Sequence, residues 1–145
     1  SLTKKKISIE DVIKLTNLAE NYSISELTDN CLSKNIKKIN KIFNENIFSV
    51  DDCVLIIRTL LSKTKRLLEI KKITNENKNI EEIISNYRPP IFWKDKEIVK
   101  NQLSKWNLND AEKLIYKINQ IELNIKKNYY NSLNIVSDFI INTAK

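Results

Sequence analysis

The longest helical pattern in the sequence is the segment 51–73, which reads DDCVLIIRTLLSKTKRLLEIKKI. Its apolar side chains recur at helical spacing, as Ile57, Leu61 and Leu68 do, so they share one face of an α-helix. Isoleucine also favours strands, but few parts of the chain alternate apolar and polar residues as a strand would. The segment therefore predicts a long amphipathic helix, and the same periodicity elsewhere predicts an all-α protein.

The same helix carries three basic side chains, Arg58, Lys65 and Lys72, at seven-residue spacing. We expect this basic stripe on the face opposite the apolar one. Such a stripe can contact phosphate groups, or it can be the solvated face of a helix in a lysine-rich chain, and the second interpretation is the more common one.

Capping signals mark the other helices. At five expected helix starts a serine or asparagine stands three residues before an acidic residue, an arrangement typical of helix N-termini: Ser8 with Asp11, Ser23 with Glu26, Ser49 with Asp52, Asn79 with Glu82, and Asn107 with Asp110. Because the chain has no glycine, we expect asparagine to take positive φ at the helix ends, with stops at Asn21, Asn46, Asn86 and Asn128. Together these signals predict a helical bundle of about eight helices.

Two residue types are missing, and their absence limits the chemistry. Without glycine, the known nucleotide-binding loops and the nucleophile elbow cannot form, because each needs positive φ or a close backbone approach. Without histidine, the chain lacks the usual general base and the commonest metal ligand. The acidic pairs at 51–52 and 81–82 fall in first helical turns, where the helix dipole explains them. We therefore expect no catalytic residue, cofactor or metal site in this chain.

Charge and cysteine content bear on the class of partner and on the redox environment of the protein. The net charge of +7 is spread along the chain, and only three of its 25 basic residues are arginines, so it does not point to a nucleic-acid surface. Cys31 and Cys53 lie in apolar helical patterns without a secretory signal, so we expect buried free thiols in a reducing cytoplasm. No apolar run is long enough for a membrane span. The start at Ser1 leads us to expect part of a longer protein.

One stretch, YRPPIFWK at 87–94, interrupts the helical patterns. Pro89 ends the preceding helix and keeps the residue before it extended. Ile91, Phe92 and Trp93 then bring a large apolar surface into a turn. We expect this surface to be covered by a neighbouring helix or another subunit, or else to be an internal plug of the core.

Three motifs follow one another in the second half of the chain: PPIFWK at 89–94, QLxxW at 102–106 and IELNIK at 121–126. In order and spacing they resemble the C-terminal part of the bacterial DNA polymerase III delta subunit, a clamp-loader protein. Upstream, IEDV at 9–12, SELTD at 25–29 and the helical pattern from Asn35 to Phe43 resemble the same family. The resemblance covers nearly the whole chain.

This resemblance implies a non-catalytic part of the clamp-loader complex, which loads the sliding clamp onto DNA during DNA replication. Residues 1–21 would end the second, AAA+ lid-like domain, and residues 22–145 would form the C-terminal helical collar domain. The implied partners are the tau or gamma and delta-prime subunits, bound through the collar, whereas the clamp and DNA would be contacted only by the full-length protein or the complex. The domain that grips the clamp in this family is not in this sequence, so clamp opening is assigned to no residue here.

The candidate interface or structural residues are those of the turn and of the two later motifs: Arg88, Pro89, Pro90, Ile91, Phe92, Trp93, Lys94, Trp106 and Lys126. Two other classes of function also fit. A stand-alone helical bundle that antagonises a host protein, as in viruses, would need an open apolar groove near Phe92 and Trp93. A nucleic-acid-binding module would use the basic stripe, with Tyr129 or Tyr130 as stacking groups.

Overall fold

The computed structural model describes residues 7–74 and 79–145, and within these ranges the chain forms seven α-helices, one short 3₁₀ helix and no strand. The elements are α1 (Ile9–Leu32), α2 (Ile36–Glu45), α3 (Val50–Thr74), α4 (Ile80–Asn86), α5 (Lys96–Lys105), α6 (Leu108–Lys127), the 3₁₀ helix η1 (Tyr129–Asn131) and α7 (Ser132–Ala144). The prediction of an all-α bundle of about eight helices is confirmed.

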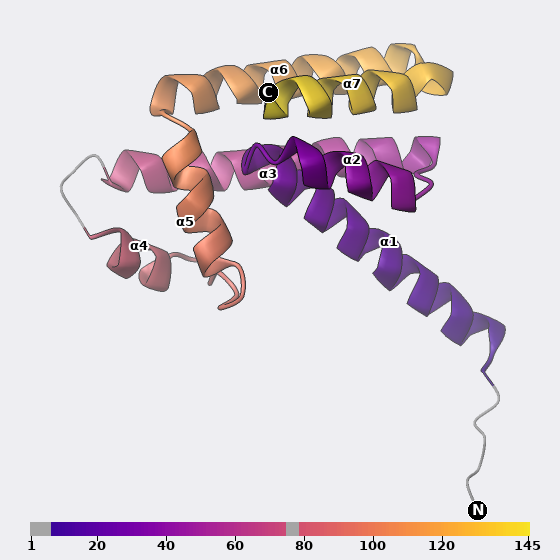
Figure 1. Cartoon of the computed structure of the whole chain (residues 1–145), viewed down its shortest axis with the longest axis horizontal. Helices are drawn as coiled ribbons and strands as arrows, with labels where there is room; N and C mark the ends of the chain where they lie inside the picture. Colours follow the sequence, from indigo (N-terminus) through magenta and orange to yellow (C-terminus); the bar gives the residue numbers. More distant parts are fainter. Residues whose placement is uncertain (1–6, 75–78) are drawn as a thin grey trace, which may run out of the picture.

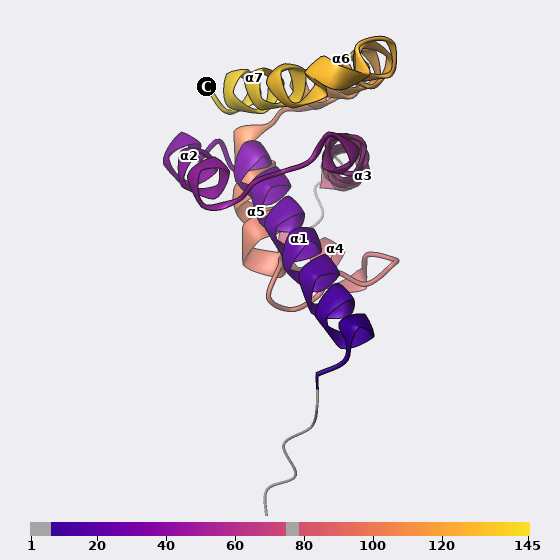
Figure 2. The same ribbon diagram turned by 90° about the vertical axis from the view of Figure 1, so that its right-hand side faces the viewer.

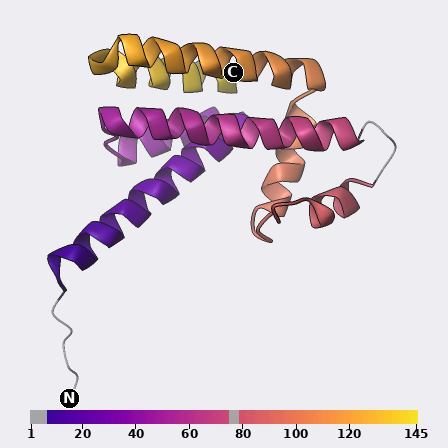
Figure 3. The same ribbon diagram turned by 180° about the vertical axis from the view of Figure 1, so that it is seen from behind.

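Helix α3 is the central element of the bundle (Figure 1). Helices α6 and α7 lie side by side along one side of α3, as the view from behind also shows (Figure 3). The C-terminal half of α1 packs against α2, α3 and α7, and Figure 2 shows α1 crossing between α2 and α3. Helices α4 and α5 lie near the C-terminal end of α3, and α5 leads from there to the start of α6.

The core follows from the amphipathic pattern of α3. Its fully buried apolar residues recur every three or four positions and are Cys53, Ile56, Ile57, Leu60, Leu67 and Ile70. Ile118 and Ile125 of α6 and Ile140 of α7 complete the same cluster. Each fully buried isoleucine or leucine contributes about 1.5–3 kcal/mol to folding. The predicted helix 51–73 is therefore confirmed almost to the residue.

The prediction of two separate helices in the first 32 residues is wrong. Helix α1 continues from Ile9 to Leu32, and Asn21 and Ser23 lie inside it. The Ser23 hydroxyl donates to the Ala19 carbonyl at 3.0 Å and to Asn46 Oδ1 at 2.9 Å instead of capping a helix. No proline or glycine stands in this segment, so nothing interrupts the helical hydrogen bonds at Asn21.

The other N-cap predictions hold. Ser8 with Asp11 and Ser49 with Asp52 form reciprocal side-chain to backbone hydrogen bonds at the starts of α1 and α3. The side chains of Asn107 and Asn79 accept from the backbone N–H groups of Asp110 and Glu81. Asn35 also caps a helix, α2, although no acid stands three residues later.

The predicted use of positive φ by asparagine is also wrong. Among the described residues only Lys34 has positive φ, 56°, whereas Asn46 and Asn128 have φ near −125°. Lys34 follows the end of α1, where its N–H donates to Cys31 and the Asn35 N–H donates to Asn30, in the Schellman arrangement that usually has glycine. A cation–π contact, with Lys34 Nζ 4.4 Å from the Trp106 ring centre, helps to hold a lysine there.

Both cysteines are buried free thiols, as predicted. The Cys31 thiol donates to the Ile140 carbonyl of α7 at 3.8 Å, and burial raises its pKa from 9.0 to about 12. Burial, together with the Asp52 carboxylate, raises the pKa of Cys53 to about 11. None of the helices in the described ranges combines the length and the apolar character that crossing a membrane requires.

Candidate interaction surface

The segment between α4 and α5 is held to the bundle by one side chain and by hydrogen bonds. Ile91 is buried at 6 % exposure and joins the core cluster. The Asp95 N–H donates to the Phe92 carbonyl at 2.8 Å, which closes the turn before α5 begins. Pro89 follows a cis peptide bond, and both Pro89 and Pro90 are exposed.

Phe92 and Trp93 point outward from this turn. They are 59 % and 69 % exposed, and their ring centres lie 6.0 Å apart. Lys94 Nζ lies 5.4 Å from the centre of the Trp93 ring. The apolar surface of the turn is therefore divided: Ile91 is an internal anchor, whereas the two aromatic rings form an exposed pair, which we call the aromatic tip.

The QLxxW motif has a structural role within this chain. Gln102 Nε2 donates to the Asp29 carbonyl at 2.9 Å, and Trp106 Nε1 donates to the Leu32 carbonyl at 2.8 Å. Both carbonyls belong to the last turn of α1. The Asp29 carbonyl also accepts from the Ser33 N–H at 2.9 Å, whereas Leu32 is the last residue of the helix and its carbonyl has no partner inside it. Gln102 and Trp106 are buried, so the motif joins α5 to the end of α1 and positions the turn that precedes α5.

A half-buried lysine, Lys63, joins α1 to α3. Lys63 Nζ lies 2.9 Å from Asp29 Oδ1, and it also donates to the Ser25 carbonyl and hydroxyl and to the Thr28 hydroxyl. Burial lowers the pKa of Lys63, and the Asp29 carboxylate opposes that shift. Nothing in the sequence distinguishes Lys63 from the other lysines, because its partners come from a distant helix.

A groove of about 680 Å³ runs between α1 and α5 beneath the aromatic tip. Phe92, Tyr22 and Ile98 are its large apolar residues, and most of its remaining lining is polar or charged. The groove beside Phe92 therefore has a mixed apolar and polar lining, and Trp93 does not line it. The host-antagonist alternative stays a prediction.

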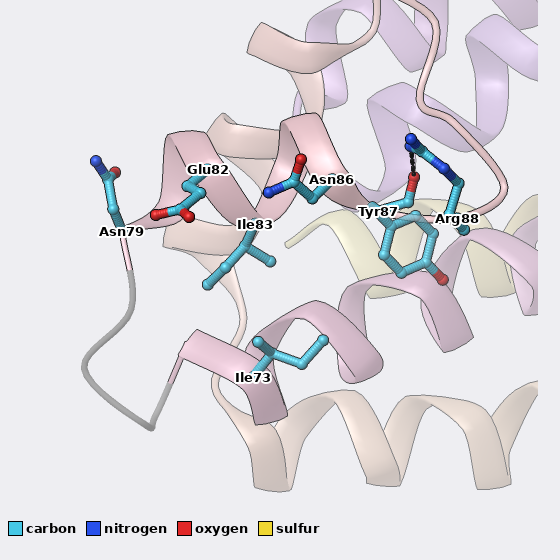
Figure 4. Close-up of a pocket in the computed structure, with 7 residues that line it drawn as sticks. All are labelled: Ile73, Asn79, Glu82, Ile83, Asn86, Tyr87 and Arg88. Atoms are coloured by element: carbon cyan, nitrogen blue, oxygen red, sulfur yellow. Dashed lines mark hydrogen bonds between the residues drawn. The ribbon is translucent and has the colours of Figure 1, made fainter.

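A second pocket, of about 710 Å³, lies between the end of α3 and α4 (Figure 4). Ile73 and Ile83 face each other across it, and Tyr87 and Arg88 form one end. The Tyr87 hydroxyl donates to the Glu69 carboxylate. Burial and this hydrogen bond raise the pKa of Tyr87 to about 12, so the phenol is a neutral donor at physiological pH.

The predicted basic stripe lies on the exposed side of α3, away from the packed face, because Arg58, Lys65 and Lys72 are all exposed. Arg58 Nε lies 3.5 Å from the Glu122 carboxylate of α6, and Lys126 Nζ lies 3.6 Å from the same carboxylate. Lys65 and Lys72 are exposed. The stripe thus contributes one interhelical ion pair and two solvated lysines.

The two tyrosines predicted to stack with bases lie at the other end of α3. The Tyr129 hydroxyl donates to Asp51, in the first turn of α3. A helix rises 1.5 Å per residue, so Asp51 and Lys72 are about 30 Å apart along its axis. Tyr129 and Tyr130 are therefore not brought together with the C-terminal end of the basic stripe.

The acidic pairs at 51–52 and 81–82 contribute a helix cap and an ion pair. Asp52 caps α3, and Glu81 pairs with Lys100 of α5, which lowers the pKa of Glu81. No group of three potential metal ligands occurs in the part of the chain that the structure describes.

The N-terminal half of α1 presents an exposed apolar surface. Val12, Leu15 and Leu18 are 51 %, 61 % and 65 % exposed, and this half projects away from the bundle (Figure 1). The helical spacing of these residues predicted the apolar stripe but not its exposure, because periodicity does not say which neighbour covers a stripe.

No protein-family model, no curated protein and no solved structure matches this chain.

Proposed function

We propose that this chain is a helical interaction module without catalytic chemistry of its own, corresponding to the collar end of a delta-like subunit of a bacterial clamp loader. Its partners would be neighbouring subunits of the tau or gamma and delta-prime type, and its place would be the cytoplasm. On this proposal the chain supports loading of the sliding clamp onto DNA by fixing how subunits pack. The ordered motifs at 89–94, 102–106 and 121–126 support the family, and the aromatic tip supports an interaction surface.

The aromatic tip is the observation that carries the proposal. Phe92 and Trp93 are large and exposed, and they stand on a segment that Ile91 anchors in the core. Aromatic residues contribute a large share of binding energy when a partner buries them. A rigid support lowers the entropy lost on binding, because the rings are already positioned.

The exposed apolar half of α1 gives independent support. Its exposed apolar side chains lie between residues 9 and 22, whereas the second half of the same helix packs in the bundle. An apolar helix face of this kind is typical of a surface that a further protein segment covers. Its position agrees with the predicted boundary near residue 21, which stays a prediction.

Association with the collar domains of partner subunits tests the proposal. We expect the protein to co-elute with them in size-exclusion chromatography, and the double variant Phe92→Ala/Trp93→Ala to weaken the association at least tenfold, since two buried aromatic contacts are worth more than 1.4 kcal/mol. Tyr116→Ala, at an exposed position on α6, is the matched control and should bind normally. Separate elution of the unmodified proteins, or equal binding by both variants, would contradict the proposal.

A further inference from the structure

A third pocket lies between the exposed side of α3 and the Pro89–Pro90 segment, and its charge differs from that of the other pockets. It has a volume of about 410 Å³ and is lined by four basic side chains, Lys63, Lys65, Arg66 and Arg88, with Glu69 as its one carboxylate. Two of the three arginines in the chain therefore meet at one pocket, although they are 22 positions apart in the sequence.

Internal pairing accounts for only part of this charge. Lys63 is held by Asp29 at 2.9 Å, and Glu69 accepts a hydrogen bond from the Tyr87 hydroxyl. Arg88 Nη1 donates to the Tyr87 carbonyl at 3.0 Å, which orients the guanidinium and leaves its other N–H groups available (Figure 4). The Glu69 carboxylate keeps its charge, because the phenol that donates to it is neutral, and it offsets one of the three positive charges on Lys65, Arg66 and Arg88. A surplus of positive charge therefore remains in the pocket.

Arg66 supplies the most specific observation. Its Nε is buried, and among the described residues it has no hydrogen-bond acceptor. Because Nε is enclosed by protein, a ligand in the pocket that Arg66 lines would bind the Nη groups of its guanidinium. No hydrogen bond joins these Nη groups to a described residue, so the guanidinium fork is available to an anion.

We propose that this pocket binds a phosphate group. A guanidinium fork matches the oxygens of phosphate in a bidentate manner, and two guanidiniums with one ammonium suit a dianion better than the single charge of a carboxylate. The Pro89–Pro90 segment forms the opposite wall, so the pocket exists only because the turn folds back against α3. This site is separate from the aromatic tip, and it stands whether or not the proposed function does.

The small number of arginines makes the test direct. The Nε–H groups give only three arginine signals in a ¹⁵N-labelled protein, one each for Arg58, Arg66 and Arg88. Titration with inorganic phosphate should shift the signals of Arg66 and Arg88 saturably at millimolar concentration. The Arg58 signal should respond no more than it does to sodium chloride at the same ionic strength, because Arg58 pairs with Glu122 outside the pocket.

Variants keep the proposal falsifiable. Arg66→Gln should weaken phosphate binding, followed at Arg88, by about tenfold or more. Lys65 is exposed, so Lys65→Gln tests the same site if Arg66→Gln folds poorly. Lys117→Gln, at an exposed position on α6, removes the same charge outside the pocket and is the control.

A parallel titration with adenosine monophosphate identifies the source of the phosphate group: equal affinity indicates the phosphate group alone, and tighter binding indicates a nucleotide. Linear shifts without saturation, or equal shifts of all three arginines, would overturn the proposal.

Discussion

At the scale of single residues, the two tryptophans show how one residue type serves two purposes. Trp106 is 9 % exposed and donates to the Leu32 carbonyl at the end of α1, whereas Trp93 is 69 % exposed and lies beside Phe92 and Lys94 of its own turn. A buried indole needs a partner for its N–H, and a partly solvated one does not. The stability of the bundle should therefore depend on Trp106 far more than on Trp93.

Trp106→Phe should lower the free energy of unfolding by about 1–3 kcal/mol, because it removes the N–H and leaves the Leu32 carbonyl without that donor. Trp93→Phe, the matched control, should change it by less than about 0.5 kcal/mol. Urea denaturation followed by circular dichroism measures both values. Similar losses in the two variants would show that the hydrogen bond to α1 does not stabilise the bundle.

At the scale of elements, α1 is one helix with two environments. Its second half contributes Ile24, Leu27 and Cys31 to the core, while residues 9–22 are exposed along their whole length. A helix of this length without tertiary contacts is marginally stable in water. The first half is therefore sustained by its capping box and by continuity with the packed half.

In native-state hydrogen exchange, the amides of α1 should fall into two groups, before and after about residue 22, that differ in opening free energy. We expect amides of residues 13–20 to exchange through local fraying, with opening free energies well below the global value, whereas amides of residues 27–32 exchange only on global unfolding. Leu15→Asn should leave the global stability within about 0.5 kcal/mol, in contrast to Leu27→Asn in the core. Uniform protection along α1 would mean that its exposed half has a partner, such as a second copy of the chain.

At the scale of the whole molecule, the buried thiols link stability to pH. Cys31 and Cys53 have raised pKa values in the folded state, about 12 and about 11, because the thiolate is poorly solvated in the core. Above pH 9 the unfolded chain loses thiol protons that the folded chain retains. The stabilisation is thus complete below pH 9 and is lost as the pH rises toward the folded values.

Denaturation should show the free energy of unfolding falling between about pH 9 and pH 10.5, by up to about 1.4 kcal/mol per pH unit for each thiol. Lys63 acts in the opposite direction because its folded pKa is lowered, but it is present in every variant compared. The double variant Cys31→Ala/Cys53→Ala should be less stable at neutral pH and should have a flatter decline. An unchanged slope in this variant would exclude the thiols as the cause.

Local signals in the sequence predicted the helices well. The apolar spacing around Ile57 predicted α3, and the serines at 8 and 49 predicted two helix starts, because capping and amphipathic spacing depend on nearby residues. The prediction of a helix start at Ser23 was wrong, since a serine before an acid also fits the middle of a helix when a neighbouring carbonyl and Asn46 accept a hydrogen bond from its hydroxyl.

The sequence by itself determined the all-α class, the long central helix and the burial of the two cysteines, since these follow from periodicity and residue type. Only the tertiary structure decided that Ile91 turns inward while Phe92 and Trp93 turn outward, that Lys63 pairs with Asp29, and that Arg66 meets Arg88 at one pocket. Each of these outcomes depends on which helix lies opposite a side chain. That choice is made by packing between segments far apart in the chain, which no local pattern records.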